Sequence, residues 1–395
     1  MTDPAREGCI TGVGIVSCLG EGLDAHWQKL TAGETSIDTQ NFAPFIVHPI
    51  CVLDFDKQIP KKGDQRQMEA WQRIGTYAAG LALESAGIKG NADILSKTDM
   101  IVAAGGGERD VTADSAILSA LPNAANPDAL LNEKLMSDIR PTLFLAQLSN
   151  LLAGNISIVQ GVTGSSRTFM GEESSGVDAL RIALARINAG QSDIALVGGS
   201  YNGERKDQLL LYAFGDELLT GDYRTIWDRG PKGGLVMGSL GAFLVLESRA
   251  HAERRKAPIL ARLSAVMSDR SPRDKDPVAP SLRTMWDRIK SRIAPGTAFL
   301  SGATGSAAAT DGERAFLAEH GDIPVRATGS YIGHGMEPAF PMNVALAALA
   351  LSRGSLFAPR DKTGFEKPMT GALKQVVVTS AGYWRGEGMA LVEAA

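Results

Sequence analysis

The chain has 395 residues, with 40 basic against 44 acidic side chains, and 44% of its residues are hydrophobic. This length suffices for one large domain or for two to three ordinary ones. The net charge of -4 supplies no basic excess for nucleic acid, and no segment resembles a membrane span or a secretory signal. We therefore expect a cytoplasmic protein with no nucleic-acid partner and no membrane span.

The three cysteines, Cys9, Cys18 and Cys51, all lie at the start of the chain. Their odd number excludes a fully paired disulfide framework and favours a reducing compartment. Beyond residue 51 no cysteine nucleophile is possible. With five histidines in all, a histidine-rich metal site is not expected, and the sequence indicates no metal and no cofactor.

Short apolar runs, most with glycine at one end, recur along the chain and predict strands buried on both faces. In chain order they are Cys9–Ile15, Asp99–Gly105, Asp193–Gly199, Gly241–Glu247, Ala298–Gly302, Gln375–Ser380 and Met389–Glu393. Helical spacing predicts helices at Gln65–Gly87, Gly176–Gly190 and Met342–Leu351, the last of them apolar nearly all round and hence buried. Strands alternating with helices predict a layered α/β fold.

The order of these elements suggests two unequal halves, because each half has a glycine-ended strand followed later by another strand. The basic stretch Arg249–Pro258 is the expected boundary, which divides the chain into an N-terminal half at 1–256 and a C-terminal half at 257–395. Asp269–Pro280, with three prolines among charged residues, predicts an exposed loop.

The segment most informative about function is a β-like run, Ser165–Met170, that leads through Gly171–Gly176 directly into a helix. Such an elbow presents one side chain above a sheet and aims backbone N–H groups at it. The presented group would be Glu172 or Glu173. Alternatively, both are ordinary first-turn carboxylates that stabilise the helix by a few tenths to about one kcal/mol.

Several long motifs resemble the β-ketoacyl-acyl carrier protein (ACP) synthases of the FabF type. They are CITGVGIVSCLGEGLDAHWQKLTAGETSI, RQMEAWQRIGTYAAGLALESAGI, AGQSDIALVGG and TIWDRGPKGGLVMGSLGAFLVLES. The resemblance covers essentially the whole chain. It implies the thiolase fold, a five-layered αβαβα arrangement of two pseudo-repeated halves that dimerises through the strand beside the elbow.

The resemblance also locates departures at the reactive centre. Glu173 occupies the position of the family's nucleophilic cysteine, and Ala303 that of its first catalytic histidine, in SGATGSAAATDGE. The second histidine is retained as His334 in IGHGMEPAF, whereas Gly329 stands where a lysine is expected. On this reading His334 either keeps part of its family role or simply caps or bridges near the buried helix.

The family's C-terminal glycine-rich turn reads Gly382–Glu387 here, and two of its glycines are replaced by Trp384 and Arg385. Together with Tyr383 these residues are expected to line and fill the pocket, or alternatively to bind a substrate. Arg385 could also form a salt bridge with Glu173.

Condensation needs a thiolate to hold the acyl group, and it needs donors aimed at the enolate oxygen. Glu173 and Ala303 supply neither, so the resemblance implies a partner subunit like a chain length factor, paired with a cysteine-containing paralogue or with itself and acting on ACP. The sequence of residues 140–173 further resembles the second synthase-like protein of alphaproteobacterial clusters that make very-long-chain hydroxy fatty acids for lipid A. The alternatives are a malonyl-ACP decarboxylase and an unorthodox synthase using another nucleophile such as Ser174.

Overall fold

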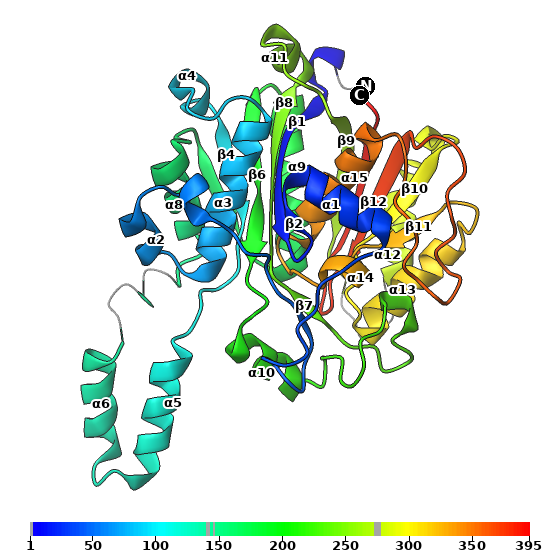
Figure 1. The fold of residues 1–395 in the computed structure, drawn as a ribbon. Coiled ribbons are helices and arrows are strands. Elements are labelled where there is room, and N and C mark those ends of the chain that lie inside the picture. The colour runs from blue at the N-terminus through cyan, green and yellow to red at the C-terminus, as the bar shows by residue number, and fades with distance from the viewer. Residues whose placement is uncertain (1–2, 140–142, 145–146, 272–277) are drawn as a thin grey trace.

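The computed structural model describes residues 3–139, 143–144, 147–271 and 278–395. One large sheet runs through the molecule (Figure 1), and its first half follows the order β1-β8-β6-β4-β5. These strands are β1 (Gly8–Ser17), β8 (Leu240–Ser248), β6 (Ile194–Tyr201), β4 (Asp99–Ala103) and β5 (Ser166–Phe169). β4, β5 and β6 are parallel, while β8 is antiparallel to both β6 and β1.

The second half of the sheet repeats this pattern. Its strands are β9 (Ala261–Asp269), β13 (Glu387–Glu393), β12 (Gln375–Ala381), β10 (Thr297–Ser301) and β11 (Val325–Ala327), in the order β9-β13-β12-β10-β11. Again the three outer strands, β11, β10 and β12, are parallel, while β13 is antiparallel to both β12 and β9. The halves join where β1 pairs with β9, at Gly8 with Leu263, Cys9 with Arg262 and Ile10 with Ala261. The predicted self-similarity thus appears as identical strand order and direction.

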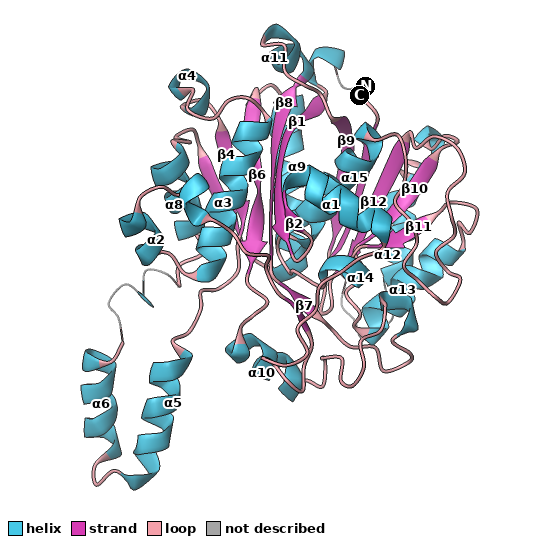
Figure 2. Ribbon diagram, in the orientation of Figure 1, coloured by secondary structure: helices cyan, strands magenta, loops and turns pink. Residues whose placement is uncertain are grey.

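Helices cover both faces of each half, giving five layers (Figure 2). One outer layer holds α3 (Ala70–Ser85) and α8 (Leu151–Gln160), the other α12 (Val278–Asp287) and α13 (Ala307–Ala318). The middle layer is formed by α9 (Glu172–Asn188) and α15 (Ala339–Ser352), which pack on each other and on strands of both halves. Because α15 is enclosed between two sheet faces, its nearly continuous apolar surface is buried as predicted.

The stretch Gln65–Gly87 was predicted as one helix and is in fact two, α2 (Lys62–Gln67) and α3. Met68 is extended between them, and Glu69 caps α3. The Glu69 side chain accepts a hydrogen bond from the backbone N–H of Gln72, and the Gln72 side chain accepts one from the backbone N–H of Glu69. This reciprocal capping starts a new helix at Ala70 although the apolar spacing is continuous.

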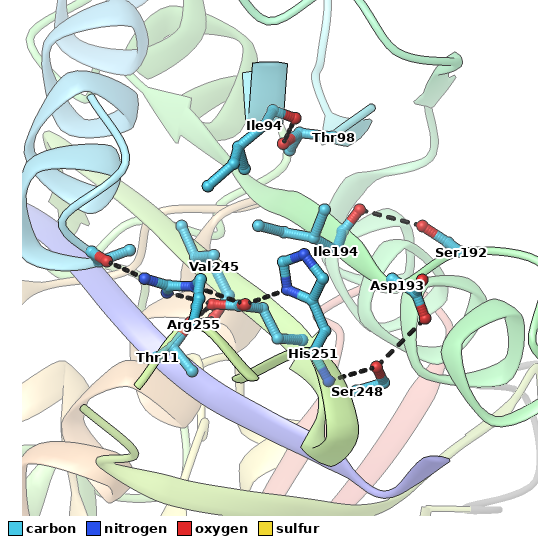
Figure 3. Close-up of polar contacts among 12 residues, drawn as sticks. Thr11, Ile94, Thr98, Ser192, Asp193, Ile194, Val245, Ser248, His251 and Arg255 are labelled. Carbon is cyan, nitrogen blue, oxygen red and sulfur yellow. Dashed lines mark hydrogen bonds and ion pairs between the residues drawn. The ribbon is translucent and has the colours of Figure 1, made fainter. Parts of the chain in front are cut away.

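The expected boundary segment is structured rather than a free linker. It contains α11 (Arg249–Arg254), and its cations pair with carboxylates in or next to the sheet. Arg249 Nε lies 2.9 Å from Glu7, which precedes β1, and Arg255 binds the buried Glu247 of β8. Figure 3 shows His251 and Arg255 of this segment beside Thr11 of β1. The basic composition therefore reflects ion pairs, and the division at residue 256 stays a proposal.

The predicted loop Asp269–Pro280 is shorter than expected. Asp269 belongs to β9, a strand that the sequence patterns missed, and Val278 to Pro280 already belong to α12. Residues 272–277 lie outside the described residues. β9 escaped prediction because polar residues interrupt its apolar ones, and only Ala261 and Leu263 are fully buried.

The remaining elements connect these layers. They are β2 (Gly20–Glu21), α1 (Gly22–Ala32), β3 (Val47–His48), α4 (Ala92–Leu95), α5 (Val111–Ala120), α6 (Pro127–Ser137), α10 (Lys206–Phe214), β7 (Met237–Gly238) and α14 (Gly329–Ile332). α5 and α6 extend together away from the body (Figure 1). None of the helices within the described residues is long and apolar enough to cross a membrane. All three cysteines are free thiols.

Candidate functional site

The predicted elbow forms between β5 and α9. Gly171 has a φ of 134°, and Glu172 has a φ of 57°, a left-handed conformation that is uncommon for any residue with a side chain. Ser174 Oγ donates to the Gly171 carbonyl at 2.7 Å, and Ser175 Oγ donates to that of Glu172 at 2.7 Å. These bonds hold a strained turn of the kind that clusters at functional positions. The turn sends the two glutamates in different directions.

Glu173 points into the core and is only 1% exposed. Its Oε1 lies 2.8 Å from His334 Nε2 and accepts the Tyr383 backbone N–H at 3.1 Å. Burial by itself would raise the pKa of Glu173, but the hydrogen bond and charge of His334, with backbone N–H groups, bring that pKa below its usual value. The position that the resemblance assigns to a nucleophile therefore holds a carboxylate paired within the protein.

His334 reaches this carboxylate from the loop between α14 and α15. Its backbone is fixed on both sides, since its N–H donates to Val236 at 2.8 Å and its carbonyl accepts from Gly238 at 2.9 Å. The suggested salt bridge between Arg385 and Glu173 is wrong: Arg385 Nε instead lies 3.9 Å from Glu172 Oε2. A histidine ring held by a rigid loop reaches the buried carboxylate, while Arg385 stays partly exposed.

Tyr383, Trp384 and Arg385 behave differently from one another. Tyr383 lies in the lining of a cavity beside the elbow and makes an edge contact with Tyr212, their ring centroids 5.5 Å apart. The Trp384 side chain is 60% exposed, so in this chain by itself it does not fill the pocket as expected. Its large apolar side chain instead faces solvent on the outside of the turn Gly382–Glu387.

Ala303 is buried, in the hydrophobic cluster that α12 and α13 help to form. It packs in the cluster that includes Ile226 and Phe299, and its N–H donates to Ser301 Oγ at 3.1 Å. Gly329 lies directly behind it: a β-carbon at 329 would be 3.1 Å from both the Ala303 carbonyl oxygen and Ile226 Cδ1. Space around residue 329 is therefore tight for any longer side chain.

The structure brings together further residues that the sequence patterns did not single out. A cavity of about 190 Å³ lies at the carboxyl ends of β4 and β6, a common location for binding sites in α/β sheets. Its lining comprises Trp71, Gly105, Gly106, Glu172, Ser200, Tyr201, Asn202, Arg205, Gln208, Leu211, Tyr212, Met336, Glu337 and Tyr383. One signal was visible: Glu337 is an acidic residue inside an otherwise apolar stretch that leads into a buried helix.

The cavity is acidic in character. Burial, reinforced by the charges of Glu173 and Glu172, raises the pKa of Glu337 to about 7. Burial and the charge of Glu173 likewise raise the pKa of Glu172. The one arginine in the lining, Arg205, is engaged by Asp207 at 2.6 Å and by the Gly107 carbonyl at 2.8 Å. An anionic ligand therefore finds little compensation here.

Comparison of the sequence with known families places residues 6–252 in the family model for the β-ketoacyl synthase N-terminal domain. Among curated proteins, the 3-oxoacyl-[acyl-carrier-protein] synthase 2 of Vibrio cholerae is 24% identical over 65% of this chain. That match spans only 62% of the relative's own length. An oxytetracycline polyketide β-ketoacyl synthase 1 from Streptomyces rimosus is 25% identical over 89% of this chain and 86% of its own.

Solved structures agree in fold. The ishigamide ketosynthase/chain length factor superposes with a TM-score of 0.79 at 20% identity and covers 99% of both chains. A β-ketoacyl synthase from Burkholderia phymatum gives a TM-score of 0.78 at 19% identity, covering 100% of both chains. The expected thiolase fold, five-layered αβαβα, is thereby confirmed.

Proposed function

Because the chain belongs to the β-ketoacyl synthase family, we propose that it serves as a non-condensing subunit, similar to a chain length factor, beside an active, cysteine-containing ketosynthase. In this role it would shape the acyl site of a complex that receives its chains from an acyl carrier protein. We place that complex in cytoplasmic fatty acid synthesis, specifically in making very-long-chain acids for lipid A.

The observation that carries this proposal is the closed Glu173–His334 pair. A condensing enzyme must expose a nucleophile that can hold an acyl thioester. Here the corresponding side chain is a carboxylate, 1% exposed and already bonded to the retained histidine and to the Tyr383 amide. Ala303 adds no donor for an enolate oxygen. The residues therefore favour a structural role over acyl transfer.

Exposed apolar side chains support a protein partner. Met170, at the end of edge strand β5, and Leu210, Leu211 and Phe214 of α10 all expose more than half of their surface. Large exposed apolar groups of this kind mark interaction sites. Two of the structural neighbours are also assemblies: a ketosynthase/chain length factor, and a type II polyketide ketosynthase in complex with its acyl carrier protein. A homodimer through the same strand is the alternative assembly.

Co-expression with a cysteine-containing ketosynthase from the same genome tests this directly. We expect the two chains to co-purify, and we expect condensation of acyl-ACP with malonyl-ACP only by the pair. The chain alone, and its Glu173→Cys variant, should remain inactive, because Ala303 and Gly329 still lack the family's groups. Condensation by the isolated chain that is lost in Glu173→Ala would refute the proposal. Release of CO₂ from malonyl-ACP without chain growth would instead identify a decarboxylase.

A further inference from the structure

A second cavity lies at the amino ends of β4 and β6, whereas the elbow and its cavity lie at the carboxyl ends of these strands. Its volume is about 450 Å³, and its lining comes from α4, from the turn after α9 and from α11. The charged and titratable residues of this lining are Asp93, Lys97, Asp99, Asp193, His251 and Arg254. The way these groups are paired determines which ligand the cavity can bind.

The ring of His251 is held in place by a buried carboxylate. Its Nδ1 lies 2.5 Å from Oε2 of Glu247, which is 0% exposed and is also bound by Arg255. Burial opposes ionisation, yet the hydrogen bonds of Arg255 and His251 lower the pKa of Glu247 to about 2, so an ionised carboxylate accepts the Nδ1 proton. Nε2 makes no hydrogen bond to a described residue, and Figure 3 shows the ring directed towards Ile194, which lines the same cavity. The cavity therefore receives an oriented imidazole nitrogen.

Two of the three aspartates in the lining are already neutralised by arginines. Asp99 pairs with Arg186 Nε at 2.9 Å and accepts a hydrogen bond from Ser165 Oγ at 2.6 Å. Asp193 pairs with Arg6 Nη1 at 2.5 Å. Both arginines lie outside the lining. These two aspartates therefore add little net negative charge to the cavity.

The two cations of the lining have no such partner. Lys97 follows α4 and makes no ion pair with a described residue. Arg254 is the last residue of α11 and, unlike its neighbour Arg255, also makes no ion pair within the described part of the chain. Asp93 is the one lining carboxylate left to oppose these two positive charges. The lining therefore has an excess of positive charge, which a proton on His251 Nε2 would increase, and it attracts anions.

The positions of the donors favour a phosphate group. Lys97 approaches from the side of α4, whereas Arg254 and His251 belong to α11. Ammonium and guanidinium groups donate charge-assisted hydrogen bonds to phosphate oxygens. A carboxylate has its two oxygens in one plane, whereas a phosphate group presents three acceptor oxygens in different directions. Donors that come from separate elements can therefore each reach an oxygen of the same group.

We propose that this cavity binds the phosphate group of a small anion, with Lys97, Arg254 and the protonated Nε2 of His251 as its donors. Asp93 opposes binding and limits the charge that the cavity accepts. The site lies at the opposite ends of the strands from the elbow. The inference therefore does not depend on the proposed partner role.

Calorimetric titration of the full chain at low ionic strength tests the proposal, with potassium phosphate and glycerol 3-phosphate as probes. We expect saturable binding of at least one of them. Lys97→Gln and Arg254→Gln should each weaken it about tenfold, because each removes a charge-assisted hydrogen bond. Asp93→Asn should tighten it about threefold, because it removes the opposing charge. Tighter binding of glycerol 3-phosphate would identify a phosphate ester as the ligand, and equal binding would show that inorganic phosphate suffices.

A dependence on pH tests the role of His251. Sulfate is the probe here, because its charge does not change near neutral pH. Histidine changes its charge between about pH 5 and 8, so sulfate should bind the parent more tightly at the lower end of that range. This difference should disappear in His251→Gln. The other titratable groups around the ring belong to residue types that keep their charge over this range; they are Asp93, Lys97, Asp99, Asp193, Glu247, Arg254 and Arg255.

Lys256→Gln is the matched control. It removes the same charge from the same segment as Arg254→Gln, but Lys256 does not line the cavity. It should bind the probes as the parent does. Absence of saturable binding, or equal weakening by Lys256→Gln and Arg254→Gln, would overturn the inference. Lys97 and Arg254 are exposed, so their variants should fold, which melting curves without anion verify. Failure to co-purify with a ketosynthase would refute only the proposed function.

Discussion

Two buried carboxyl groups of this protein lie in opposite surroundings. Glu247, at the end of β8, is 0% exposed and accepts hydrogen bonds from Arg255, from His251 at 2.5 Å and from Thr11. Glu337, beside the elbow, is 5% exposed, and its Oε2 has no partner among the described residues. Burial opposes ionisation at both sites, yet the hydrogen bonds of Arg255, His251 and Thr11 bring the pKa of Glu247 to about 2, whereas the pKa of Glu337 is raised to about 7.

The difference separates a group that stabilises the fold from one that costs stability. A buried charge is tolerated when counter-charges and hydrogen bonds replace the lost water, as at Glu247. Glu337 lacks that compensation, and such uncompensated groups persist mainly where function requires them. The same contrast explains why ion pairs fix the segment around α11 to the sheet, whereas the cavity beside the elbow contains a carboxyl oxygen of Glu337 without a partner.

The largest effect should come from breaking the compensated site. We expect Glu247→Gln to lower the free energy of unfolding by about 3 kcal/mol or more, because it leaves the Arg255 guanidinium without its counter-charge. Urea unfolding at pH 7 measures this. Glu337→Gln, the matched change, should not destabilise the protein at that pH. A loss as large in Glu337→Gln as in Glu247→Gln would erase the distinction between the two sites.

The pH dependence of stability should be opposite in sign at the two carboxyls. The folded-state pKa of Glu337 lies above its unfolded value, so its contribution is fully present below about pH 4.5 and is lost as pH rises through about 7. At pH 8 we expect Glu337→Gln to be more stable than the parent by up to about 3 kcal/mol, with the difference vanishing near pH 4.5. The stability from Glu247 is present above about pH 4.5 and falls as pH drops through about 2. Urea unfolding of the parent and the variants at a series of pH values measures these contributions. A difference in the free energy of unfolding that does not change with pH would contradict the prediction.

The smallest effect should come from an exposed residue that neither site uses. Trp384→Ala should change the free energy of unfolding of the isolated chain by no more than about 0.5 kcal/mol, because the indole is largely in solvent. The same variant should weaken association with a partner chain if that partner covers the turn. A large loss of stability in the isolated chain would show that Trp384 packs inward after all.

The sequence predicted the periodic elements well, because strands enclosed on both faces and the helix α15 carry unbroken apolar runs. It missed β9, in which most residues are half-buried and polar residues interrupt the apolar ones. It also missed the break at Met68, which depends on the capping of α3 by Glu69. Motif comparison singled out Glu173 but not its hydrogen-bond partner. Whether His334 or Arg385 reaches that carboxylate depends on loop geometry. The position of Glu337 depends on close approach to Gly105 and Gly176, which are distant from it in the sequence.

The pairing of β1 with both β8 and β9 has a consequence for how the protein is made. β1 is synthesised before every other strand of this sheet, yet both of its long neighbours begin more than halfway along the described chain. Through most of synthesis, β1 therefore lacks its two long partner strands, and its apolar side chains are not yet buried. Such long-range pairing makes folding slow and exposes the nascent chain to aggregation, so we expect productive folding to depend on protection of this one strand during translation.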